Sequence, residues 1–238
     1  MTRRHGTAPI QWLDQLDVLG DHTIIGHGIF LDHHPWTRWP KTGDLARLAE
    51  TGTTVAHCPT VFARRGISLR DFGSYRQAGV NMGIGTDVYS HNMIDEMRLA
   101  AYVARVVAEN PWETYAADIF AAATVGGAQA LGRDDIGRLA GGAKADLVLI
   151  DVTHPMMRPA RDPLRSLVYS AADRAIRDVF VDGDQVVADG HVQTIDCVAA
   201  AEALEAAQQR ALADIPGLDW AGRSADQVAP PSLPYAND

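Results

Sequence analysis

Short apolar runs alternate with amphipathic stretches through the first half of the chain, a pattern typical of strands followed by helices. Three of the apolar runs end in a polar residue, and these residues are His27, His57 and Asp87. Helical patterns lie between and after them, bounded by Gly or by capping residues. Strands are predicted at 23–26, 53–56 and 80–85, and helices at 7–19 (capped by Thr7), 44–51 (closed by Gly52), Leu69–Ala78 (capped by Ser68) and Met93–Ala108.

The three strand-end residues are evenly spaced along the chain. His27 and His57 are 30 residues apart, and so are His57 and Asp87. A strand, its crossover helix and the next parallel strand take about 30 residues, so this spacing predicts a parallel α/β array. Parallel strands deliver the residues at their carboxyl ends to one edge of a sheet. We therefore expect the three side chains to lie within reach of a single substrate.

The pattern changes at Gly137, where a Gly-rich turn leads into a different kind of segment. Two more helices are predicted before it, at Thr114–Ala123 and Val125–Leu131. After it we expect a strand at Ala145–Asp151, a helix at Pro163–Ala171 and a hairpin with the turn Asp182-Gly183. A final helix at Ala199–Asp214 and a loosely held tail at Ile215–Asp238 end the chain. The expected domains are an α/β domain at 1–136, a β segment with a packing helix at 137–195, and the C-terminal helix and tail at 196–238.

The net charge argues against two classes of partner. The chain carries 21 Lys+Arg and 30 Asp+Glu, which gives −9 at pH 7. Nucleic acids and anionic membranes require clustered basic residues, so neither is expected as a partner. The most apolar helical stretch, Leu99–Val107, contains Arg105 and is too short to span a bilayer. With two cysteines and no apolar signal-peptide core near Met1, a cytoplasmic location is expected.

Asp87 and the two histidines suggest hydrolysis by a metal-bound water. A divalent ion lowers the pKa of bound water toward neutrality, and a carboxylate can hold the ion and take the proton. A neutral imidazole could polarise the electrophile or stabilise the oxyanion. Catalytic zinc usually has three protein ligands, however, and the sequence contains no His-x-His or His-x-x-Glu pair. Each residue also has a structural alternative, namely a hydrogen-bonded strand-end histidine or, for Asp87, a helix cap.

Several neighbouring residues are weaker candidates. His91 and Asn92 lie in the loop after the third strand and could line a substrate pocket. Cys58 is expected to be a small buried thiol, because neighbours along a strand point to opposite faces and His57 would not activate it. Glu96, in the helix that follows, could reach back to the site or serve a surface or helix-packing role.

Several motifs occur in a characteristic order. They are T-I-I-G-H-G-I-F-L-D, L-A-E-T-G-T-T-V-A-H-C-P-T, A-G-V-N-M-G-I-G-T-D with E-M-R-L-A after it, A-A-T-V-G-G-A-Q-A-L-G, G-R-L-A-G-G-A-K-A-D-L-V-L-I-D and V-F-V-D-G-D-Q-V-V-A-D-G. This series resembles the amidohydrolase superfamily, and within it the guanine, S-adenosylhomocysteine and triazine deaminases and chlorohydrolases. The resemblance extends from residue 5 to residue 195.

The resemblance implies an α/β fold that is the C-terminal portion of a (β/α)8 TIM-like barrel, with strands 6–8 and their helices, plus a portion of a small β-sandwich domain. It implies one divalent metal ion, either zinc or iron, and deamination of a small purine-, nucleoside- or triazine-like heterocycle at a non-peptide C–N bond. Asp87 matches the aspartate that ligates the metal and shuttles protons. His27 matches the histidine that contacts the hydrolytic water or the substrate, and His57 matches a pocket residue.

The sequence also departs from the family pattern. The His-x-His and His-x-x-Glu ligand motifs have no counterpart, and Val61-Phe62 replaces the usual Ser-Asn after H-C-P-T. Three strands form an open sheet, whereas barrel closure takes about eight. We therefore expect the N-terminal half to be supplied in the same or a separate polypeptide, and this chain alone to be inactive. The alternative is a non-catalytic subunit or binding module on the same scaffold, and a homo-oligomer is compatible with either.

Overall fold

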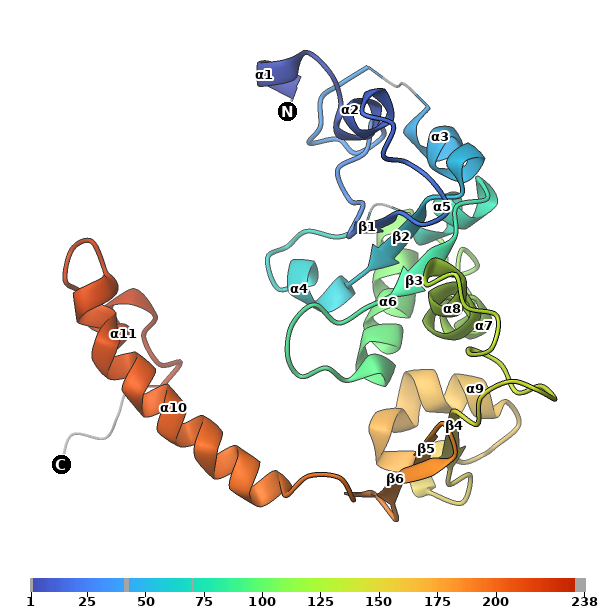
Figure 1. Ribbon diagram of the computed structural model, residues 1–238, viewed down its shortest axis with the longest axis vertical. Coiled ribbons are helices and arrows are strands. Elements are labelled where there is room, and N and C mark those ends of the chain that lie inside the picture. Colours follow the sequence, from blue (N-terminus) through green and yellow to red (C-terminus); the bar gives the residue numbers. More distant parts are fainter. Residues whose placement is uncertain (1, 41–42, 70, 234–238) are drawn as a thin grey trace. The chain divides into compact units, whose positions relative to one another are not determined.

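The computed structural model describes residues 2–40, 43–69 and 71–233 of the chain. It divides into two compact units, Met1–Gln185 and Val186–Asp238. Figure 1 shows the first unit as a mixture of short strands and helices, which confirms the predicted α/β class. The strands are β1 (Ile24–Gly26), β2 (Thr54–His57), β3 (Met82–Ile84), β4 (Leu147–Ile150), β5 (Ile176–Val181), β6 (Asp184–Ala188) and β7 (His191–Val192).

The helices alternate with the first three strands as predicted. In chain order they are α1 (Thr2–His5), α2 (Pro9–Gln15), α3 (Asp44–Thr51), α4 (Pro59–Ala63), α5 (Phe72–Gln77), α6 (Met93–Ala108), α7 (Ala116–Ala121), α8 (Gly127–Ala130), α9 (Pro163–Ser166), α10 (Cys197–Leu218) and α11 (Ala225–Val228). The bounds of α3 and α6 agree with the prediction because both helices have clear end signals. Gly52 closes α3 in the left-handed conformation, and Asn92 caps α6.

The first three strands form a parallel sheet in the order β1-β2-β3. The central strand β2 is buried along most of its length, with Thr54 and Val55 almost inaccessible to solvent. The outer strand β1 exposes Ile24, which is 43% accessible. Parallel sheets are normally covered on both faces and closed barrels have no edges. In the described residues this sheet is open, and no barrel closes.

Two helices start later than their sequence pattern predicts. Helix α2 starts at Pro9 with Ala8 as its N-cap, because the Thr7 hydroxyl donates to the Gln11 side chain instead of accepting from the backbone. Helix α5 starts at Phe72, because the Asp71 carboxylate rather than Ser68 accepts the Ser74 amide. Of the helix expected over Leu69–Ala78, Arg70 lies outside the described residues.

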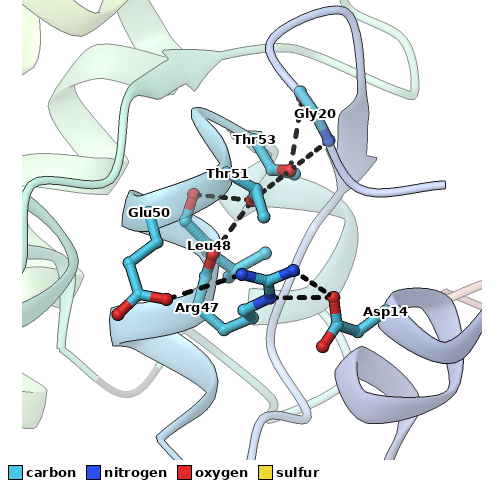
Figure 2. Close-up of polar contacts among 7 residues, drawn as sticks. All are labelled: Asp14, Gly20, Arg47, Leu48, Glu50, Thr51 and Thr53. Atoms are coloured by element: carbon cyan, nitrogen blue, oxygen red, sulfur yellow. Dashed lines mark hydrogen bonds and ion pairs between the residues drawn. The ribbon is translucent and has the colours of Figure 1, made fainter. Parts of the chain in front are cut away.

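Polar contacts hold the segment that leads into β1 (Figure 2). The Arg47 guanidinium of α3 lies 2.7 Å from Asp14 of α2 and 3.5 Å from Glu50. The Thr53 hydroxyl accepts the Gly20 amide at 3.0 Å. The ion pairs are partly exposed and contribute little free energy by themselves. The long-range Thr53–Gly20 bond, in contrast, fixes the chain just before β1, the strand that His27 follows.

The helices predicted at Thr114–Ala123 and Val125–Leu131 form one continuous run rather than two. A π-helical turn, Ala122–Gly126, joins α7 to α8. This run packs closely on β3, because a Cβ built on Gly126 would lie 2.2 Å from the Met82 carbonyl oxygen. The Asn81 side-chain amide donates to the Gly126 carbonyl at 3.0 Å and links the end of the turn to the sheet.

A second sheet has the order β4-β5-β6-β7, and β4 pairs with β5 in antiparallel fashion. The predicted hairpin is confirmed. Its turn residues, Asp182 and Gly183, have φ values of 52° and 90°, and positive φ at both positions is the mark of the tight turns that suit twisted hairpins. The helix predicted at Pro163–Ala171 is also present, as α9 continued by a π-helical segment.

The C-terminal helix is longer than predicted. Helix α10 starts at Cys197, after the Asp196 carboxylate accepts two backbone amides, and it continues through Leu218. The short helix α11 follows, so part of the predicted tail is helical, and residues 234–238 lie outside the described residues. No helix in the described portion of the chain is long and apolar enough to cross a membrane.

Candidate active site

His27 and Asp87 meet at the carboxyl ends of the parallel strands. The His27 Nε2 atom lies 3.5 Å from Asp87 Oδ2, and the two side chains are 29% and 43% exposed. Both residues have left-handed backbones, with φ values of 70° and 57°. Such conformations are uncommon for residues other than Gly and are enriched at functional sites. Asn92 rather than Asp87 caps α6, so the helix-cap alternative for Asp87 does not hold.

His27 is held both at its backbone and at its side-chain ring. Its backbone amide donates to the Ala56 carbonyl at 2.8 Å, which extends the β1–β2 pairing by one residue. The His27 ring packs edge-on against Phe62 of α4, with ring centroids 4.6 Å apart. The Nδ1 atom is buried and has no hydrogen-bond partner among the described residues. The remaining nitrogen, Nε2, is the one that faces Asp87.

His57 lies at the end of β2 and is deeply buried, at 3% exposure. Its ring lies near Phe72, and its Nδ1 atom has no hydrogen-bond partner in the described portion of the chain. Burial, and to a smaller extent the nearby His27, lower the pKa of His57 to about 4. The imidazole is therefore neutral at neutral pH. A contact between His57 and the substrate stays a prediction.

The low pKa of His57 predicts a loss of stability in acid. Between pH 6.5, the ordinary value, and pH 4, the unfolded chain binds a proton at this site and the folded chain does not. The free energy of unfolding should therefore fall as the pH falls through this window. Urea unfolding at several pH values measures the slope. In His57→Gln the slope of the free energy of unfolding against pH should correspond to up to one proton fewer taken up on unfolding. The control His22→Gln, at an exposed histidine, should have the wild-type slope. Equal slopes in all three proteins would contradict the assignment.

The two predicted loop residues form contacts of their own. The His91 Nδ1 atom lies 3.1 Å from the Thr86 hydroxyl. The Asn92 side chain accepts the amides of Ile94 and Asp95 at the start of α6, and its Nδ2 donates to Asp173 at 2.9 Å. The amide group of Asn92 is thus engaged in capping. A substrate-binding role for either residue stays a prediction.

The Cys58 thiol is a poor candidate for a nucleophile. The residue is buried, and burial is the main cause that raises its pKa to about 11. The charges of Asp87 and Glu96 raise the pKa further. Because only the thiolate is strongly nucleophilic, Cys58 is inert at neutral pH. The expected buried thiol is confirmed.

The donor set for a metal ion is incomplete in the described residues. No three side chains of His, Cys, Asp or Glu type gather closely enough there to hold an ion. A catalytic zinc usually takes three protein ligands and an open position. Asp87 and His27 bring two donor groups together, which is too few. The described residues by themselves therefore do not fit a complete catalytic metal site.

Glu96 and Phe62 belong to the site's surroundings, and only weak sequence signals point to them. Glu96 is buried at 4% exposure, so a surface role is excluded, and its Oε2 accepts the Thr60 amide at 3.1 Å. Phe62 belongs to α4, a helix absent from the prediction because Cys58-Pro59 is typical of a break. The departure Val61-Phe62 from the family pattern is the one sequence signal that points to this position.

The comparisons with known proteins identify the class. The Amidohydrolase family matches residues 2–186, and the chain belongs to this family. It is 35% identical over 195 residues to 5-methylthioadenosine/S-adenosylhomocysteine deaminase of Natronomonas pharaonis, over 80% of this chain and 43% of that protein. It is 32% identical over 211 residues to 5'-deoxyadenosine deaminase of Methanothermobacter thermautotrophicus, over 87% of this chain and 47% of that protein.

A solved structure shows the same fold. The chain resembles an adenosine deaminase from Xanthomonas campestris with bound zinc, with a TM-score of 0.80 and 29% identity. The match covers 88% of this chain and 47% of that one. The chain thus spans about half the length of the relatives it matches.

Proposed function

We propose that this chain is the C-terminal portion of a metal-dependent amidohydrolase that deaminates an adenosine derivative. The observation that carries the proposal is the 3.5 Å approach of His27 Nε2 to Asp87 Oδ2 at the carboxyl ends of parallel strands. In open and closed α/β sheets, reactive groups gather at this edge. The two curated relatives are named for the deamination of adenosine derivatives, which favours such a ring over a triazine.

In this reaction water adds to the ring carbon that carries the amino group, the C–N bond breaks and ammonia leaves. The proton lost by the water must reach the departing nitrogen. Asp87 is proposed to carry it, because its carboxylate is partly exposed to solvent and can accept a proton and return it. The His27 imidazole is proposed to orient that carboxylate or the water through Nε2. His57 is proposed to form an uncharged wall of the pocket.

The rest of the site is proposed to come from polypeptide outside this sequence. Among the described residues the β1 edge is unpaired on one side and exposes Ile24, which suits a further strand and its helices. Strands β1 to β3 would then be the sixth to eighth strands of a barrel within residues 1–136. The segment 137–195 would return to a β-sandwich. Asp87 would be one ligand of a divalent ion, for which zinc is the first choice.

A chimera tests this proposal. Residues 1–238 would follow the N-terminal half of the Methanothermobacter thermautotrophicus deaminase, with the parent enzyme as the positive control. We expect the folded chimera to contain stoichiometric zinc and to release ammonia from 5'-deoxyadenosine or S-adenosylhomocysteine. The isolated 238-residue chain should do neither.

A non-catalytic binding module on the same scaffold is the second candidate. The incomplete donor set in the described residues favours it. Under this alternative, a chimera that is monodisperse and cooperatively folded would contain zinc below stoichiometry and release no ammonia. That result would overturn the deaminase proposal.

A further inference from the structure

The short helix α4 lies directly beside the candidate site and does not cap its own N-terminus. The first amides of a helix have no partner within the helix, and a side chain near the N-terminus normally accepts one of them. The N-cap residue of α4 is Cys58, whose side chain accepts no such bond. The amide of Thr60, the second residue of α4, donates instead to Glu96 Oε2 at 3.1 Å. The acceptor thus comes from α6, 36 residues away in sequence.

Burying the Glu96 side chain at this position costs free energy. It is 4% exposed, and a buried carboxylate loses its hydration. A charge-assisted hydrogen bond to a backbone amide offsets some of this cost. Helix packing alone would be served equally well by an apolar side chain of similar volume. The bond to Thr60 is therefore the feature that distinguishes Glu96 from such a side chain.

A series of contacts connects Glu96 through α4 to His27. Thr60 and Phe62 lie on the same five-residue helix, so a bond that fixes the first turn also restrains the backbone that carries the Phe62 ring. That ring packs edge-on against the His27 imidazole at 4.6 Å. His27 in turn presents Nε2 to Asp87. Without the acceptor, α4 would still be held by its buried residues Pro59 and Val61, but its first turn would lose the polar contact to α6 and the Phe62 ring would be held less firmly against the imidazole.

We infer that Glu96 is a positioning residue: it holds α4 against α6 so that Phe62 keeps the His27 imidazole facing Asp87. The catalytic consequence of this inference rests on the proposed function, but the contact itself does not. The effect of Glu96 on α4 and on the His27 ring can therefore be measured in the 238-residue chain without any activity assay.

Hydrogen exchange measured by NMR on the isolated chain tests the inference. Glu96→Met keeps the volume but removes the acceptor, whereas Glu96→Gln keeps an acceptor oxygen. The Thr60 amide should exchange at least about 10-fold faster in Glu96→Met than in the wild type, because local opening controls exchange. The His27 ring signals should shift as Phe62 moves. Glu96→Gln should restore both properties, and Asp95→Asn, at the neighbouring exposed carboxylate, should change neither.

Two results would overturn the inference. One is a folded Glu96→Met protein with wild-type exchange at Thr60 and unchanged His27 signals. The other is fast Thr60 exchange in Glu96→Gln, which would show that the acceptor oxygen is not what holds α4. The second result is decisive even if Glu96→Met does not fold. Neither depends on ammonia release or zinc, so failure of the deaminase proposal would be seen separately, in the chimera.

Discussion

Asp87→Asn is expected to lower kcat/KM for ammonia release by the chimera by at least about 10³-fold, toward the upper end of the range for loss of a general acid–base group. An amide cannot accept and return a proton and is a weaker ligand for a divalent cation than a carboxylate. Asn tolerates the left-handed backbone at this position about as well as Asp does, so the fold should be retained. Stopped assays with S-adenosylhomocysteine, zinc analysis and circular dichroism provide the three measurements.

Asp17→Asn is the matched control. Asp17 is also an aspartate with positive φ, at 56°, and it is exposed in the segment between α2 and the amino end of β1. The substitution Asp17→Asn should leave turnover within about twofold of the unsubstituted chimera, as expected for a surface position. Undiminished turnover in Asp87→Asn would remove Asp87 from the chemistry and with it the central residue of the proposed function.

Gly126→Ala and Gly127→Ala are expected to change stability in opposite directions. A Cβ at Gly126 would lie 2.2 Å from the Met82 carbonyl oxygen, which is backbone and cannot rotate away. The helical run would have to move off β3 and lose the Asn81 bond to the Gly126 carbonyl. We expect a loss of about 3 kcal/mol or more in the free energy of unfolding, the size of a severe overpacking effect.

The neighbouring glycine has room for a methyl group. The nearest atom to a Cβ at Gly127 is the Ala122 carbonyl oxygen at 4.0 Å, and the backbone there is right-handed helical. Alanine should therefore stabilise the protein by about 0.5–1 kcal/mol through its higher helix propensity. Urea unfolding of the isolated chain measures both variants. Equal effects at the two positions would mean that the π-helical turn Ala122–Gly126 does not pack against β3 as described.

Local signals account for much of what the sequence predicts correctly. Helix α6 has an Asn cap and an apolar face, and the hairpin has Asp-Gly between two alternating strands. The spacing of His27, His57 and Asp87 reports a repeated strand–helix unit, and the parallel pairing of β1, β2 and β3 places their ends at one edge. The helix, the turn and the spacing are encoded within windows of a few residues or in a simple period, whereas the pairing of the strands joins residues about 30 positions apart.

Other features are decided only by contacts that the local pattern does not show. Thr7 and Ser68 have the character of caps, but a competing side-chain bond and the next available carboxylate move the starts of α2 and α5. The boundary between the helices predicted at Thr114–Ala123 and Val125–Leu131 lies within a π-helical turn, Ala122–Gly126, which continues the run where it packs closely on β3. Local propensity is weak compared with such tertiary contacts.

In the candidate site, too, some features follow from the local sequence and others from tertiary contacts. The sequence by itself placed His27 and Asp87 at the ends of parallel strands, because strand period and spacing are local properties. Only the tertiary structure brought their side chains to 3.5 Å and buried Glu96 against α4, because both contacts join residues distant in sequence. The sequence shows that the His-x-His and His-x-x-Glu motifs are absent, and the tertiary structure adds that no three His, Cys, Asp or Glu side chains converge among the described residues.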